Sequence, residues 1–264
     1  MVALRHAGIR LALALLAMAG WLNVAPAATP SGAVIAVVQS SQADGATGSR
    51  ILSVEAPVYS GDKIITGLVG EAQIKFRDNT KLVVGPNSSM VIDAFVFSDN
   101  NTARQVSIDA VRGAFRFITG SSPKDAYSIS TPTATIGVRG TEFDFNVGRV
   151  DGQTELVMFG GMTRICPKLL SDGSPNKDLR QCTEAKAACG MTIIPPAGDI
   201  RQLKASEERN VLITRDFRYI RNQERLLADF QVNTSTCGNT YAEPPPSNLG
   251  SSRPAPPPPR ERTD

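Results

Sequence analysis

The chain has 264 residues, of which 41% are hydrophobic, and its 28 basic and 25 acidic residues give a formal net charge of +3. A charge so close to balance gives no electrostatic reason to expect nucleic acid or an anionic membrane as a partner. The only histidine is His6.

The N-terminus has the pattern of a secretory signal peptide. Arg5 and Arg10 precede an apolar run from Leu11 to Leu22, and Ala25-Pro26-Ala27 supplies the small residues that signal peptidase reads. A transmembrane anchor is the alternative, but it needs about 20 apolar residues and this run is shorter. We therefore expect residues 1–27 to be removed, which leaves a periplasmic chain without a membrane span and a charge of 26 − 25 = +1.

Residues 28–198 read as a β domain. Apolar and polar residues alternate over Ala72–Phe76 and again over Thr154–Met158, as in half-buried strands. Turn residues separate these runs, for example Arg77–Thr80 and Gly85–Asn87.

The most informative segment is Tyr127–Val147. Its pattern predicts two strands, and Gly137 and Gly140 lie between them on either side of Arg139. The paired glycines indicate a tight turn or a close backbone approach. In the second strand the phenylalanines share one face and Glu142 and Asp144 share the other.

A weak internal repeat supports a stacked β architecture. Val111–Phe117 resembles Val138–Phe145 with one inserted residue, and the two Arg-Gly pairs stand 27 residues apart. Short strands that recur at such a period are typical of stacked coils, each of which buries its apolar face against the next. We therefore expect a compact all-β fold like a β-solenoid or β-helix, with a two-sheet β-sandwich as the alternative.

Four cysteines remain after export, and an even number in an exported protein indicates two disulfides. Three pairings are possible. We expect Cys166–Cys182, which closes a polar loop, and Cys189–Cys237, which ties the C-terminal segment to the β domain.

The chain changes character after the β domain. Residues 199–238 are helix-compatible over Ile200–Asn210 and more clearly over Arg215–Phe230, where apolar residues recur at helical spacing. We expect a helix that packs over an open end of the β domain and hides its edges; a partner-binding helix is the alternative. Residues 239–264 are rich in proline and should be an extended, disordered spacer.

The sequence offers little for catalysis. Without His6 no Ser–His–Asp or Cys–His site can form, and the cysteines lack metal-binding spacing. Nucleotide-binding glycine motifs are absent as well, so we expect no enzyme, no metal and no cofactor. Glu142 and Asp144 are the one carboxylate pair to weigh, and an acid–base role requires a set separation between two such groups.

The residues that we single out for binding are Arg139, Glu142 and Asp144. The planar guanidinium of Arg139 can grip a carboxylate. The flanking glycines favour a structural role instead, in which Arg139 holds turn carbonyls or pairs with Asp144 or Asp109.

These motifs bear a family resemblance. TPTATIGVRGTEF (131–143) closely resembles the signature of the FecR domain, a bacterial extracytoplasmic module. Three further blocks occur in the family's order: Gly61–Gly67, Phe76–Asp93 and Val111–Gly120. The resemblance covers residues 31–165 and leans towards the solenoid-like form of the fold.

The resemblance implies a signalling role outside the cytoplasm. FecR itself is an inner-membrane regulator that controls a sigma factor through a cytoplasmic part and senses a receptor through a periplasmic part. This chain resembles only the periplasmic part, so we expect no anti-sigma activity. We expect a non-catalytic signalling or scaffold module that binds another envelope protein; a peptidoglycan-binding or polysaccharide-binding protein is the alternative.

Overall fold

The computed structural model describes residues 28–46, 48–97, 102–186, 188–204 and 206–237. By its contacts the chain divides into residues 1–30 and residues 31–264, and the elements of the fold belong to the second unit. The expected signal peptide (1–27) and proline-rich tail (239–264) lie outside the described residues, so both stay predictions.

The described residues are mainly strands, which confirms the all-β class. The first nine strands are β1 (Gly32–Val38), β2 (Ser41–Gly45), β3 (Gly48–Ile51), β4 (Pro57–Val58), β5 (Lys63–Thr66), β6 (Glu71–Phe76), β7 (Lys81–Val84), β8 (Ser89–Phe97) and β9 (Ala103–Ile118). The next six are β10 (Tyr127–Ser130), β11 (Ala134–Val147), β12 (Thr154–Pro167), β13 (Thr183–Ala185), β14 (Met191–Ile194) and β15 (Arg201–Leu203). Two short helices come after them, α2 (Glu207–Asp216) and α3 (Arg218–Arg221), and 3-10 turns span Lys124–Ala126, Leu179–Gln181, Ala228–Phe230 and Ser235–Cys237.

The fifteen strands form one hydrogen-bonded sheet that folds over into two layers. The front layer contains β2, β3, β5, β8, β10 and β13, and the back layer contains β1, β4, β6, β7, β14 and β15. Strands β9, β11 and β12 belong to both. Within the described residues β9 and β10 pair in parallel, and the other strand pairs are antiparallel.

The three long strands pass from one layer to the other at glycines. Strand β9, for example, pairs with β8 and β10 through residues 103–112 and with β7 and β11 through residues 113–118. Gly113, Gly140 and Gly161 stand at the crossings of β9, β11 and β12, with φ of 107°, 65° and 76°. At Gly161 a Cβ would lie 2.0 Å from the carbonyl oxygen of Gly140, so neighbouring crossings pack backbone against backbone.

This geometry decides between the two expectations for Gly137 and Gly140. The chain reverses at residues 131–133, where the N–H of Thr131 donates to the carbonyl of Ala134 at 2.8 Å, and not at Arg139. A tight turn at Arg139 is therefore wrong. The close backbone approach is present at the carbonyl of Gly140, inside the continuous strand β11, where Gly161 of β12 packs against it; a Cβ on Gly140 itself would meet only the Lys124 side chain.

The main hydrophobic core fills the space between the two layers. Four phenylalanines of the back layer stack at its centre, with Phe115 and Phe145 at 4.9 Å and Phe117 and Phe143 at 5.7 Å between ring centroids. Both expected architectures share features with this arrangement: a two-layer core, as in a sandwich, and strands that continue round a corner, as in a solenoid.

The segment after the β domain differs from the expected helices. Residues 201–203 form the edge strand β15, so the sheet extends beyond residue 198. Helix α2 begins at the N-cap Ser206, whose hydroxyl accepts from the N–H of Arg209 at 3.2 Å. The single helix expected over Arg215–Phe230 is wrong, because the chain leaves the helical path at Phe217 and again after Arg221.

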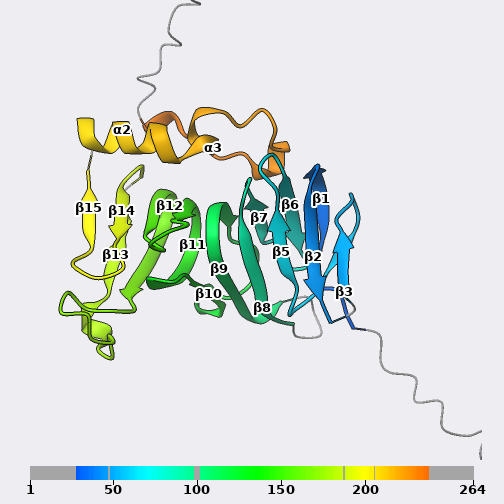
Figure 1. The fold of residues 1–264 in the computed structure, drawn as a ribbon, viewed down its shortest axis with the longest axis horizontal. Helices are drawn as coiled ribbons and strands as arrows, with labels where there is room; N and C mark the ends of the chain where they lie inside the picture. The colour runs from blue at the N-terminus through cyan, green and yellow to red at the C-terminus, as the bar shows by residue number, and fades with distance from the viewer. Residues whose placement is uncertain (1–27, 47, 98–101, 187, 205, 238–264) are drawn as a thin grey trace, which may run out of the picture. The chain divides into compact units, whose positions relative to one another are not determined.

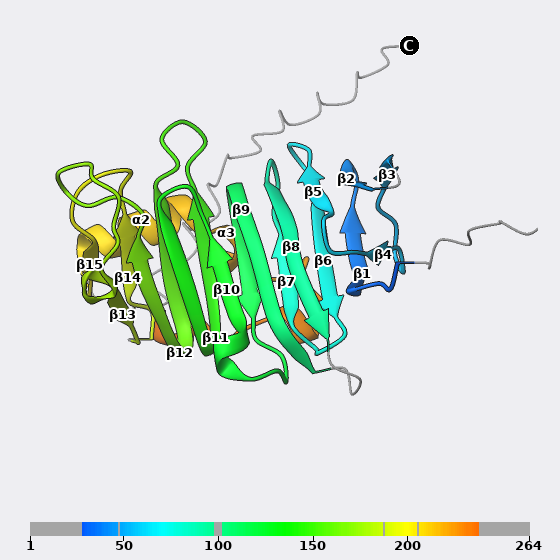
Figure 2. The same ribbon diagram turned by 90° about the horizontal axis from the view of Figure 1, so that it is seen from below.

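The position of this segment also corrects an expectation. Figure 1 shows α2 and α3 running across the strands, from β15 towards β6. In Figure 2, which views the molecule from below, both helices lie behind the strands. The segment therefore covers the outer face of the back layer and not an open end of the β domain.

Candidate functional site

A buried ion pair lies at the centre of the covered face. Arg116 on β9 and Asp144 on β11 are direct neighbours across the two strands. Each stands between two core phenylalanines, and strand pleating therefore points both side chains out of the core. The Arg116 Nε lies 2.6 Å from Oδ1 of Asp144 and Nη2 lies 2.9 Å from Oδ2, and the two side chains are 0% and 3% exposed.

The environment of this pair is both apolar and fully hydrogen-bonded. Burial raises the pKa of the Asp144 carboxyl, while the charge and hydrogen bonds of Arg116 oppose that shift. The guanidinium also lies 5.2 Å from the ring of Phe159 and 5.5 Å from that of Tyr219. An arrangement of this kind is costly to break, because loss of either partner leaves an uncompensated buried charge.

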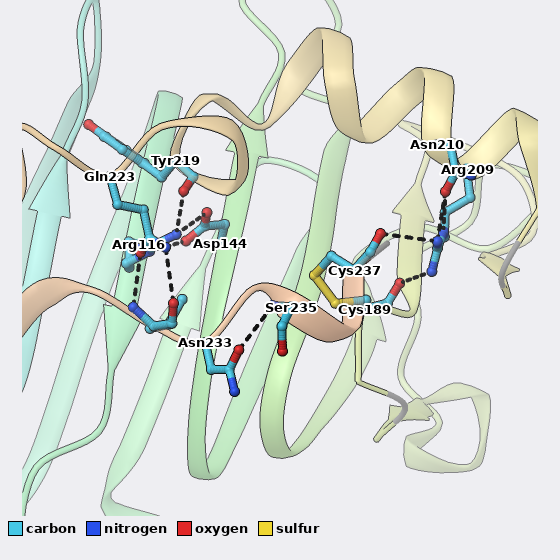
Figure 3. The surroundings of a disulfide bond; sticks show 11 residues. Arg116, Asp144, Cys189, Arg209, Asn210, Tyr219, Gln223, Asn233, Ser235 and Cys237 are labelled. Carbon is cyan, nitrogen blue, oxygen red and sulfur yellow. Dashed lines mark hydrogen bonds and ion pairs between the residues drawn. A yellow bond between two sulfur atoms is a disulfide. The ribbon is translucent and has the colours of Figure 1, made fainter. Parts of the chain in front are cut away.

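Arg116 fixes the C-terminal segment onto the sheet (Figure 3). We call residues 206–237 the strap. Arg116 donates from Nη1 to the side-chain oxygen of Gln223 and to the carbonyl of Phe230 (3.3 Å), and from Nη2 to the carbonyl of Tyr219 (3.3 Å). Gln223 in turn accepts from the N–H of Val232 at 2.9 Å. One buried guanidinium thus holds several turns of the strap.

A disulfide provides the second anchor of the strap. Cys189 and Cys237 are joined, as are Cys166 and Cys182, and these are the two pairs that the sequence led us to expect. Arg209 of α2 donates to the carbonyls of Cys189 (3.0 Å) and Cys237 (3.4 Å), which adds α2 to the same anchor (Figure 3).

Two apolar clusters fill the space between the strap and the back layer. Phe217 and Ile213 pack on the outer side chains of β12 and β14, namely Val157, Met191 and Ile193. Leu226, Phe230 and Tyr219 pack on Val83 of β7. The part of the outer face that lies under the strap is therefore in the interior of the protein.

The outer face of the front layer has no such cover from the described helices (Figure 2). We call it the open face. One row of paired residues across β9 to β13 consists of Ser107, Ser128, Gly137, Arg164 and Glu184. A parallel row across β2 to β12 consists of Asp44, Lys63, Val91, Asp109, Ser130, Thr135 and Cys166. Neither row contains a residue of the buried class, whereas the alternating inward residues are buried.

The open face is thus mainly polar in these two rows and has short side chains at its centre. Charged residues of both signs flank the serines and the glycine, including Arg164 and Glu184 on one side. Lys168 reaches onto the face and donates to the Ser130 hydroxyl at 3.0 Å. Such a surface presents backbone and hydroxyl groups together with a mixed-charge rim.

The three binding residues expected from the sequence do not come together. Arg139 is exposed at the end of the open face, opposite Met162, and makes no side-chain hydrogen bond or ion pair with a described residue. Glu142 is exposed at the bulge of β11. Asp144 is buried under the strap, so its assignment to a binding surface is wrong, and it pairs with Arg116 and not with Arg139.

Sequence reasoning missed Arg116, although a signal was present. The internal repeat places Arg116 and Asp144 at equivalent positions, each between two phenylalanines. The residue inserted in the second copy corresponds to the bulge of β11, where the register with β12 shifts between Arg139 and Phe143. Opposite charges at equivalent positions of neighbouring repeats predict a cross-strand ion pair.

Metal-binding clusters and membrane-spanning helices are both absent from the part of the chain that the structure describes. Its residues contain no group of three or more His, Cys, Asp or Glu side chains that could hold a metal ion. None of the described helices is long and apolar enough to cross a membrane.

Comparison with protein families agrees with the motifs. Residues 62–163 match the family model described as FecR protein. The chain contains a FecR domain. This domain runs from the end of the β4–β5 connection to β12 and includes both partners of the Arg116–Asp144 pair, whereas the strap lies outside it.

Two solved structures resemble the chain at low similarity. Both are described as a putative anti-sigma factor from Parabacteroides distasonis, with 12% and 13% sequence identity and TM-scores of 0.41 and 0.42. The match covers 58% of this chain and spans 63% of the length of those chains. No curated protein matches the sequence.

Proposed function

We propose that this protein is an exported, non-catalytic signalling or scaffold module of the FecR type that binds another cell-envelope protein. The presence of a FecR domain supports the signalling role. The open face then serves binding, and the covered face serves the stability of the fold.

The contrast between the two outer faces carries this proposal. The back layer has its outer face filled by the strap, a buried ion pair and two apolar clusters. The open face has serines and a glycine at its centre and both signs of charge at its rim. Short side chains leave room for larger side chains of a partner, and charges of both signs at the rim can pair with charged residues of that partner. Protein–protein interfaces are likewise polar at the rim.

The chemistry of the described residues supports a non-catalytic role. The Glu142–Asp144 pair cannot act as two facing carboxyls, because Asp144 is enclosed by Arg116 and the strap. Two disulfides favour an oxidising compartment and therefore the periplasm or the cell exterior.

Site-specific photo-cross-linking in intact cells tests the proposal. A photoreactive amino acid at Ser128, in the centre of the open face, should capture a protein that mass spectrometry can identify. The matched control carries the same group at Leu227, which is 42% exposed on the strap. Equal capture at both positions, or capture at Leu227 alone, would contradict the assignment of the open face.

The alternative function, peptidoglycan or polysaccharide binding, rests on the hydroxyl groups of the open face. Ser107, Ser128, Ser130 and Thr135 lie on adjacent strands there. Incubation with purified sacculi distinguishes the two functions: sedimentation of the protein with sacculi, lost in a Ser128→Arg variant, would favour the glycan over a protein partner.

A further inference from the structure

A pocket lined by arginines lies where the strap meets strand β6. Its volume is about 350 Å³, and its lining residues are Glu71, Arg218, Tyr219, Arg221, Asn222 and Arg225. Three guanidinium groups and one carboxylate leave a formal charge of 3 − 1 = +2 at the pocket. The pocket joins β6 of the back layer to the residues in and after α3, so it exists only while the strap is docked.

The arginines of this pocket are free to bind. Arg218, Arg221 and Arg225 make no side-chain hydrogen bond or ion pair with any described residue; Arg218 contacts the ring of Tyr219, 5.7 Å from its centroid. Neighbouring Arg215, by contrast, is paired with Asp216 at 2.7 Å. The pocket therefore collects positive charge that forms no ion pair with a described carboxylate, unlike the charge of Arg215.

The single carboxylate of the pocket does not use up this charge. Glu71 is 1% exposed. It accepts from the Tyr219 hydroxyl at 2.8 Å and from the Gln73 amide at 3.3 Å. Burial and the Glu71 charge hold the pKa of Tyr219 well above its ordinary value, so the hydroxyl keeps its proton and goes on donating. Glu71 is thus an internal acceptor at the floor, and the guanidinium groups are left for a ligand.

We propose that this pocket binds a phosphate group, either on a lipid headgroup or in solution. Guanidinium groups match phosphate oxygens bidentately. A phosphate monoester carries up to two charges on three terminal oxygens, whereas a carboxylate brings one charge on two oxygens. Three arginines that line one pocket therefore have more donors and charge than one carboxylate can satisfy. The volume admits the headgroup and not a folded chain.

Titration calorimetry of the mature, disulfide-bonded protein with inorganic phosphate and with pyrophosphate, at low ionic strength, tests this site. We expect binding that weakens as salt is added. The Arg221→Gln/Arg225→Gln variant should bind at least about tenfold more weakly, the loss of about 1.4 kcal/mol or more. The control variant, Arg104→Gln/Lys124→Gln, removes the same charge from two other exposed positions and should bind like wild type.

A second variant keeps the test independent of folding. Arg225→Lys retains the charge but loses the planar guanidinium that can donate two parallel hydrogen bonds. The variant should therefore melt like wild type and bind phosphate several-fold more weakly. Sedimentation with phosphatidylglycerol vesicles, against phosphatidylcholine vesicles, then identifies the source: retention only on the anionic vesicles indicates a headgroup.

Three results would overturn the proposal. The first is no binding of phosphate, pyrophosphate or phosphatidylglycerol vesicles. The second is an equal loss in the control variant, which would indicate a general charge effect. The third is binding of poly-glutamate without binding of phosphate, which would assign the pocket to an acidic protein. The pocket lies on the strap and not on the open face, so these results leave the proposed function untouched.

Discussion

The two outer faces of this folded sheet come from the same long strands, yet they differ in cover and in composition. On the back layer, outward side chains include a buried Arg116–Asp144 pair and apolar residues that the strap covers. On the front layer, the outward residues include serines, a glycine and charged residues, with no described helix over them. One strand therefore has a covered, buried end and an uncovered end, on either side of its crossing glycine, and we propose recognition only for the uncovered end.

The largest effect should come from breaking the ion pair that makes the covered face. Arg116→Met leaves the Asp144 carboxylate buried without a partner and removes the donors that hold the strap. We expect the free energy of unfolding to fall by about 3–5 kcal/mol in denaturant titration. The double variant Arg116→Met/Asp144→Leu should recover part of this loss. A single variant within about 0.5 kcal/mol of wild type would show that the pair does not hold the two parts together.

The next effect concerns the disulfide that anchors the strap. Removal of Cys189–Cys237 by Cys→Ser substitutions opens a loop with a sequence separation of 48 residues. The chain-entropy model gives about 4 kcal/mol for a loop of that length. We expect hydrogen exchange to accelerate across residues 206–237. The matched variant without Cys166–Cys182 should lose stability, about 3 kcal/mol by the same model, and leave strap exchange unchanged. Equal acceleration in both variants would count against a local anchor.

A smaller effect should come from the crossings between the layers. Gly161→Ala places a Cβ 2.0 Å from the Gly140 carbonyl oxygen, at a φ of 76°. We expect a loss of about 1–3 kcal/mol in thermal or chemical unfolding. Gly160→Ala is the control, because its Cβ meets nothing within 4 Å. Similar losses at both positions would mean that the crossing does not depend on glycine.

The smallest effect concerns a charge at the edge of the covered face. Burial, followed by the nearby Asp216 carboxylate, raises the pKa of Glu155 in the folded protein above its ordinary value. The folded state therefore binds the proton of Glu155 more tightly than the unfolded state does. The stability that this protonation contributes is lost as the pH rises through the folded pKa. Glu155→Gln should gain only roughly 0.5 kcal/mol at pH 7, because solvent screens part of the charge, and nothing at pH 3. A gain at pH 3 as well would point to packing and not to charge.

Local pattern was enough to predict the strands and the special role of one glycine. Alternation identified the strands, and the close backbone approach expected near Arg139 is present at Gly140. The sequence predicted that a C-terminal segment packs on the β domain, but it did not predict the path of that segment. Phe217 and Phe230 both lie in the stretch expected to form one helix, yet they contact different strands of the back layer. Tertiary contacts outweigh helix propensity there, since α3 ends at Arg221 and the Gln223 side-chain oxygen accepts from Arg116 of β9 and from the N–H of Val232.

The same limit explains the error at the candidate site. The alternation of the strand predicts that the face with Glu142 and Asp144 is exposed to solvent. The pattern does not reveal that a segment distant in the sequence covers the part of this face that contains Asp144. Asp144 is buried because a segment much later in the chain lies over it, as the hydrogen bonds from Arg116 to Tyr219 and Phe230 demonstrate. A long-range cover of this kind has no local signal.

The most direct test of recognition by the open face is the capture of a partner after that face alone is changed. The Ser128→Arg variant places a bulky charge at the centre of the open face, and a photoreactive group at Ser107 reports on contact. We predict a melting temperature close to that of the unchanged protein and loss of the cross-linked partner. A partner captured as efficiently as before would contradict the claim that the open face is the recognition surface.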